Sequence, residues 1–109
     1  MQTLKKNYEF ENVLKKGKFY IGKQITIYIS KNREDVNIFG IAISKKTCKA
    51  VKRNYIKRKI RENYRLIEKS LKKGNNIVFL WNKKVPVEDA NFHVIKQDME
   101  KLFNKAGLL

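Results

Sequence analysis

Apolar residues recur along the chain with two periods, one typical of helices and the other of strands. A period of about 3.6 residues predicts a helix, whereas alternation or a short unbroken apolar run predicts a strand. We therefore expect helices at residues 7–16, about 50–65 and about 92–106, and strands at residues 18–21, 24–30, 36–44 and 77–81. The expected order is helix, strands, helix, strand, helix.

The first and last helices have recognisable ends. Asn7 and Asn91 can each cap a helix start, because an Asn side chain accepts a hydrogen bond from a free backbone N–H group. Gly17 and Gly107 follow the last turns, where glycine commonly ends a helix. The side chains expected to face the core are Phe10, Val13 and Leu14 in the first helix, and Phe92, Ile95, Met99, Leu102 and Phe103 in the last.

Alternation is clearest at residues 24–30, where isoleucines at every second position form a core face and Tyr28 lies on the opposite face. Residues 31–37 are typical of an exposed hairpin turn, which would make residues 36–44 the partner strand.

The two later strands differ from this pattern. In the segment 36–44, Gly40 and Ala42 share one face and leave room for another group to approach it. Residues 77–81 are apolar at five consecutive positions, which predicts a central or parallel strand covered on both faces.

Charge is the strongest feature of the composition. The chain has 26 Lys and Arg against 10 Asp and Glu, a formal net charge of +16. Such an excess predicts a polyanionic partner. The length fits one domain, residues 1–109. No apolar run approaches the ~20 residues of a membrane span, and residues 1–6 lack the apolar segment of a secretory signal, so we expect a cytoplasmic protein without a membrane partner.

The residue types that carry protein-based catalysis are sparse. Cys48 and His93 are the only cysteine and histidine, too few for an intrachain disulfide, a zinc cluster or an evident nucleophile and base. A two-metal nuclease needs convergent carboxylates. The acidic pairs are instead expected in a turn, in a loop and on a helix surface: Glu34 and Asp35, Glu88 and Asp89, and Asp98 and Glu100.

The middle helix concentrates the positive charge. From Lys45 to Arg65 there are ten Lys or Arg residues and one acid, Glu62. At about 100° per residue the apolar positions form a narrow stripe beside a basic face, which predicts a helix docked on the core. The stripe consists of Ile56, Ile60, Tyr64, Ile67 and Leu71, and the basic face of Arg53, Asn54, Lys57, Arg58, Arg61 and Arg65. Solvated helices usually mix signs, so a face of one sign indicates nucleic-acid contact.

The segment 45–61, with the sequence KKTCKAVKRNYIKRKIR, resembles the RNR signature of the bacterial ribonuclease P protein family. The matching positions are Ala50, Arg53, Asn54, Ile56, Lys57, Arg58, Ile60 and Arg61. Thr47 departs from the family, which usually has an aliphatic residue there. The resemblance extends over nearly the whole chain.

This resemblance implies an α+β fold of order αβββαβα, with a central mixed sheet and a left-handed βαβ crossover through the basic helix. It also implies a division of labour. The catalytic centre, with its Mg²⁺ ions, lies in a large RNA subunit, and the protein assists the endonucleolytic removal of the 5′ leader from precursor tRNA.

By the same resemblance, two sets of residues bind RNA. Those expected to contact the catalytic RNA subunit are Lys45, Lys46, Arg53, Asn54, Lys57, Arg58, Arg61 and Arg65. Those expected along the leader path are Phe10, Leu14 and Tyr28. Asn54 could instead bond locally, and Phe10 could belong to the core.

Two alternative functions remain open at this point. Composition alone also allows a ribosomal or other structural RNA-binding protein, which would not co-purify with an RNA that cleaves precursor tRNA. The other alternative is an autonomous nuclease, which would cut RNA without an RNA subunit.

Overall fold

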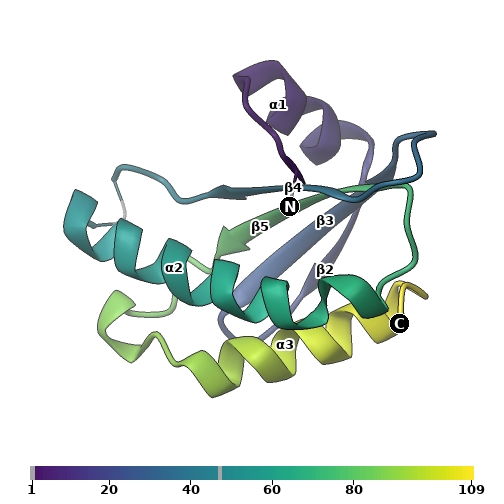
Figure 1. The fold of residues 1–109 in the computed structure, drawn as a ribbon. Helices are drawn as coiled ribbons and strands as arrows, with labels where there is room; N and C mark the ends of the chain where they lie inside the picture. The colour runs from purple at the N-terminus through teal and green to yellow at the C-terminus, as the bar shows by residue number, and fades with distance from the viewer. Residues whose placement is uncertain (1, 47) are drawn as a thin grey trace.

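The computed structural model describes residues 2–46 and 48–109, so Thr47, where the sequence departs from the family signature, lies outside the described residues. Figure 1 shows the elements in chain order. They are β1 (Gln2–Thr3), α1 (Asn7–Lys16), β2 (Lys18–Ile21), β3 (Ile25–Lys31), β4 (Ile38–Ala42), α2 (Ala50–Ile67), β5 (Asn75–Trp81) and α3 (Phe92–Lys105), with 3-10 turns η1 (Glu68–Ser70) and η2 (Val87–Asp89). The α+β fold and the order αβββαβα are confirmed, with the short β1 added in front.

Helix ends follow local chemistry. Asn91 caps α3 as predicted, its side-chain oxygen accepting the backbone N–H groups of His93 and Val94. The predicted cap of α1 was one residue too late, because Lys6 is the N-cap and Asn7 is already helical. The carboxylate of Glu9 accepts the free backbone N–H groups just before the helix, and these bonds lower the pKa of Glu9.

The sheet has the strand order β1-β4-β5-β3-β2. The prediction that residues 36–44 pair with residues 24–30 was wrong, because β5 lies between β4 and β3, parallel to the first and antiparallel to the second. The apolar run of β5 needs cover on both faces and therefore takes the centre. The turn after β3 passes around the start of β5, with Gly74 bonded to the backbone of Asn32 on one side and Val36 on the other.

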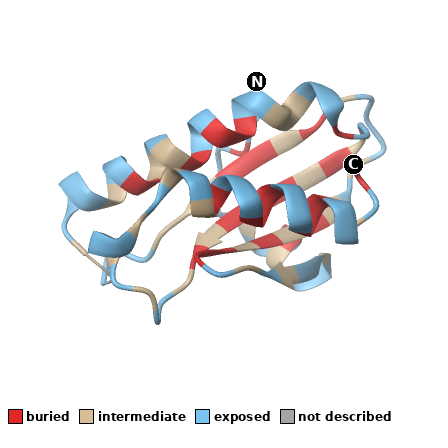
Figure 2. Cartoon of the chain, turned by 90° about the horizontal axis from the view of Figure 1, so that it is seen from below, coloured by how far each residue is buried: buried red, intermediate tan, exposed pale blue. Residues whose placement is uncertain are grey.

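Helices cover the two faces of the sheet unequally. α1 lies alone on one face, and α2 and α3 lie side by side on the other (Figure 1). In Figure 2 the buried residues of α2 and α3 line the sides of these helices that face the sheet. The larger core cluster, with the isoleucines of β3 and the apolar residues of α2 and α3, fills this space. α2 joins the parallel neighbours β4 and β5, and the left hand expected for this crossover rests on the family resemblance.

Asp98 was expected on the surface of a helix, and this was wrong. Its side chain is buried, and its two carboxylate oxygens accept the backbone N–H groups of Lys23, Gln24 and Ile25 at 2.8–3.1 Å. A Cβ atom on Gly22 would lie only 2.6 Å from the carboxyl carbon, so the tight turn before β3 closes over this carboxylate. Asp98 thereby ties α3 to the hairpin formed by β2 and β3.

Candidate nucleic-acid interface

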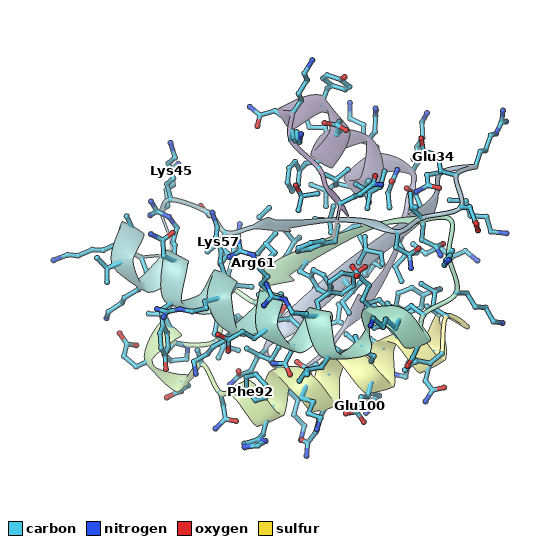
Figure 3. The ribbon with its side chains drawn as sticks, in the orientation of Figure 1. Glu34, Lys45, Lys57, Arg61, Phe92 and Glu100 are labelled. Atoms are coloured by element: carbon cyan, nitrogen blue, oxygen red, sulfur yellow. The ribbon has the colours of Figure 1, made fainter. Side chains whose placement is uncertain are left out.

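Two cations of the basic face of α2, Lys57 and Arg61, border a hollow beside β4, next to the part of its edge that β1 leaves open after Phe39. Asn54, Arg58, Arg61 and Arg65 are exposed, whereas Lys57 and Arg53 are half-buried. In Figure 3, Lys57 and Arg61 extend from α2 toward the β4 edge, and Lys45 extends from the loop before α2 toward the α1 side. Most of the residues predicted to bind the RNA subunit are thus available for contact. Lys46 is also exposed in the same loop.

Arg53 differs from its neighbours. Its guanidinium donates to the backbone carbonyls of Cys48, at 2.6 Å, and Lys45, at 3.3 Å. These bonds satisfy carbonyl groups in the loop before α2 and hold that loop against the helix. Arg53 therefore positions Lys45 and Lys46, in addition to contributing charge. Asn54, by contrast, makes no side-chain hydrogen bond to any residue that the structure describes, so the local alternative for Asn54 is not supported there.

The opposite flank of α2 shows how charge is neutralised within the fold. Lys52 pairs with Glu88 at 2.8 Å, and the Lys59 ammonium lies 4.5 Å from the centroid of the Tyr55 ring. The pairing raises the pKa of Lys52 and lowers the pKa of Glu88. Within residues 2–46 and 48–109 this is the one ion pair, so the cations of the basic face have no carboxylate partner there. Positive charges that lie close together repel one another, so the basic face is stabilised when a polyanion binds to it.

The residues predicted along the leader path lie together on the other face of the sheet. Phe10, Leu14 and Tyr28 are all half-buried and pack around the small cluster formed by Leu4, Val13 and Val78. Phe10 is therefore partly core and partly accessible, and its contact with the leader stays a prediction.

Gly40 explains how Phe10 reaches the sheet. A Cβ atom at Gly40 would lie 2.4 Å and 2.6 Å from two carbons of the Phe10 ring. Real Cβ contacts are essentially never this short, so only glycine lets the ring pack directly on the β4 backbone. The room predicted on this face is occupied by Phe10.

Two hollows join these surfaces. A hollow of about 480 Å³ lies between the first turn of α1 and the ends of β4 and β5, bordered by Phe10, Leu80 and Lys57. A smaller one of about 230 Å³ lies between β1, β4 and α2, and it is bordered by Phe10, Lys57 and Arg61. The Phe10 ring and the Lys57 side chain border both hollows. The two hollows therefore form one continuous surface from α1 to the basic face.

Sequence reasoning missed several residues of this region. Lys83 and Ser44 line the larger hollow, and no motif pointed to either. Phe19 is exposed and lies against Tyr28, with 5.6 Å between ring centroids. The predicted strand at residues 18–21 could have indicated this, because antiparallel pairing brings one of its residues opposite Tyr28.

The residues that the structure describes offer neither a metal-ligating cluster nor a membrane-spanning helix. No three His, Cys, Asp or Glu side chains come together there in a group that could hold a metal ion. No described helix is long and apolar enough to cross a bilayer.

An α+β domain in which a basic helix face without carboxylate partners lies beside hollows bordered by an aromatic ring has the features of a nucleic-acid-binding domain. The model of the Ribonuclease P family matches residues 1–107. The Ribonuclease P protein component of Clostridioides difficile strain 630 is 40% identical over 106 residues, covering 96% of this chain and 91% of that protein. The corresponding protein of Clostridium botulinum strain 657 is 38% identical over 106 residues, covering 96% and 94%.

Solved structures agree with these matches. The RNase P protein of Staphylococcus aureus superposes with a TM-score of 0.84 at 30% identity, over 99% of this chain and 97% of that one. The RNase P protein of Thermotoga maritima gives a TM-score of 0.84 at 27% identity, over 96% and 97%. The chain belongs to the ribonuclease P protein family. It is therefore a protein subunit of the ribonucleoprotein endonuclease, a hydrolase, that removes the 5′ leader in tRNA maturation.

Proposed function

We propose that the basic face of α2 docks on the catalytic RNA subunit while the α1 side of the sheet binds the single-stranded 5′ leader of precursor tRNA. The observation that supports this most directly is the position of Phe10 and Lys57, which border the same two hollows. A leader held at Phe10 would lie next to the RNA held by the basic face. The two RNAs would then meet at the open edge of β4.

The two surfaces offer different kinds of contact. The basic face provides phosphate contacts, which position RNA without reading its sequence. Phe10 and Tyr28 provide ring faces, on which any base can stack, and this suits a leader whose sequence varies among tRNAs. Together they would favour precursor tRNA, which has a leader, over mature tRNA, which lacks one.

We also propose that the Mg²⁺ ions of the reaction are held by the RNA subunit. The described carboxylates form no cluster that could hold a metal ion. The side chain of Asp98 is buried, and both of its carboxylate oxygens accept hydrogen bonds from backbone N–H groups. The role of the protein is then to supply fixed positive charge near the RNA phosphates, which lowers the demand for free Mg²⁺. Because tRNA maturation occurs where tRNA is transcribed, we place this role in the bacterial cytoplasm.

Reconstitution with the RNA subunit tests this proposal. At low Mg²⁺ concentration we expect precursor cleavage to depend on the protein, and the protein alone with Mg²⁺ to cut nothing. In the same system Tyr28→Ala should weaken binding of precursor tRNA by roughly 1–3 kcal/mol and leave binding of mature tRNA unchanged. Equal cleavage with and without protein, or equal loss for both tRNAs, would contradict the respective roles.

A further inference from the structure

The edge strand β2 exposes two large apolar side chains on the side of the sheet covered by α1. Phe19 is 58% exposed and Ile21 is 65% exposed. Apolar side chains on an edge strand carry a risk of aggregation, so natural proteins usually place charged residues there. The exposure of Phe19 and Ile21 side by side on one strand is typical of a binding surface.

The strand register places Phe19 at one end of a row that crosses the sheet. Phe19 pairs with Tyr28, Tyr28 with Val78, and Val78 with Gly40, on which the Phe10 ring packs. Directly paired residues point to the same face, so Phe19 and Tyr28 share the face of Phe10. The row spans three strand spacings, about 14 Å.

Phe19 and Tyr28 form a continuous ledge. Their ring centroids are 5.6 Å apart and their planes are inclined by 32°, so Tyr28 supports the Phe19 ring while more than half of Phe19 stays accessible. The row beside it consists of Ile21, Thr26, Leu80 and Ala42. It leads from β2 to the larger hollow, which Leu80 and Ala42 border.

We propose that Phe19 is a stacking platform for a leader nucleotide, one that lies further from the cleavage site than the nucleotides at Phe10. This inference rests on the proposed leader path. The basic face, and with it the RNA subunit, lies at the β4 edge, so a leader that enters at the larger hollow reaches β2 last. Leu14 cannot stack a base because it is aliphatic, so Phe19 supplies the third ring of the path.

Charge favours RNA over a protein partner on this ledge. Lys18 is the first residue of β2, on the opposite face of the strand from Phe19, and Lys23 follows the strand. Both are exposed, and the net charge of +16 opposes association of two copies of this chain. Lysines at an edge strand also oppose pairing with a strand of another chain. Single-stranded RNA combines the phosphates that these lysines attract with the base faces that a ring attracts.

The test uses the enzyme reconstituted from this protein and the RNA subunit, with precursor tRNAs whose leaders are shortened one nucleotide at a time, and with mature tRNA. We expect Phe19→Ala to weaken binding of the long-leader precursor about five- to tenfold, at the low end of base stacking because one ring face rests on Tyr28. The deficit should vanish below a certain leader length and be absent with mature tRNA. Phe19→Trp should bind the long-leader precursor as the wild type does, whereas Phe19→Leu should show the same loss as Phe19→Ala.

Tyr8→Ala is the matched control, because Tyr8 is also an aromatic residue with 58% exposure but belongs to no row of the sheet. It should leave leader binding unchanged. Thermal unfolding of each variant shows whether the fold is kept. A Phe19→Ala loss that does not depend on leader length, or restoration by leucine, would overturn the proposal. So would an effect confined to self-association in sedimentation.

The same leader series with Tyr28→Ala separates this proposal from the one on which it rests. If Tyr28→Ala weakens precursor binding and Phe19→Ala does not, only the platform at Phe19 is refuted. If neither variant discriminates precursor from mature tRNA, the leader path on the α1 face is refuted as well.

Discussion

Removing two cations from the basic face tests whether α2 contacts RNA phosphates. Lys57 and Arg61 are the suitable pair, because both extend toward the β4 edge and both border the smaller hollow. Neither side chain makes a hydrogen bond or an ion pair with any residue in the described part of the chain. The double substitution Lys57→Ala and Arg61→Ala should therefore leave the fold intact and change the affinity for RNA.

The size of the effect follows from counterion release. Each phosphate contact contributes about 0.7–0.9 to the slope of log affinity against log salt, so two lost contacts lower the slope by roughly 1.4–1.8. Extrapolated from 1 M salt, where this contribution vanishes, the loss at 0.1 M is about 25- to 60-fold, or about 2 kcal/mol. At 0.4 M the same variant should lose only about four- to fivefold.

Filter binding or fluorescence titration of the RNA subunit at several salt concentrations measures the slope. The control is Lys52→Ala with Lys59→Ala, which removes two positive charges from the opposite flank, where Glu88 and Tyr55 engage them. We expect the control to change the slope little. An equal change in both variants would show that net charge alone matters, and an unchanged slope in the first would remove Lys57 and Arg61 from the interface.

Two further predictions concern the packing that supports these surfaces. Asp98→Asn replaces one acceptor oxygen by a donor beside buried N–H groups, so we expect the free energy of unfolding in urea to fall by about 2–4 kcal/mol; the exposed Asp89→Asn is the control, and equal loss in both would refute the reasoning. Gly40→Ala should displace the Phe10 ring and weaken precursor binding more than mature tRNA binding, with a stability loss of roughly 1–3 kcal/mol. Normal precursor binding by this variant would show that the position of the Phe10 ring does not matter.

Local periodicity was sufficient to predict helices α1, α2 and α3 and strands β2 to β5. The stripe of Ile56, Ile60 and Tyr64 is buried in α2 as expected, and the isoleucines of β3 face the core. Pairing was harder to predict, because alternation shows that a strand has one buried face but not which strand lies beside it. The position of β5 between β3 and β4 depends on a contact distant in sequence, and the two-residue β1 is too short to show any period.

Buried polar residues show the second limit of the sequence. Asp98 follows Ile95 by three residues and precedes Leu102 by four, so its place on the buried side of α3 could have been read from spacing. Its charge argued against burial, and its partners are backbone groups more than 70 positions away. Asn63 is similar, since its amide donates to the carbonyls of Lys59 and Phe92 and so joins α2 to α3.

For the interface, the family signature predicted where the cations are but not how each is used. The residues of the basic face are all basic or polar in the sequence, yet among the described residues only Arg53 is seen to bond the carbonyls of the loop before α2. That difference depends on the path of the loop before α2, which has no periodic pattern. The exposure of Phe19 likewise depends on the position of α1, which packs on β3 and β5.

The arrangement of the sheet explains why two unlike RNA surfaces meet at one edge. β4 and β5 are parallel, so the chain must cross the sheet between them, and α2 makes this crossing on the face opposite to α1. Within residues 2–46, β1 pairs with β4 at Ile38 and Phe39, and the edge of β4 is free of β1 from Gly40 onward. The basic face reaches this edge from one side and the Phe10 ring from the other. A short β1 is therefore part of the site, because a longer strand there would separate the phosphate contacts from the stacking path.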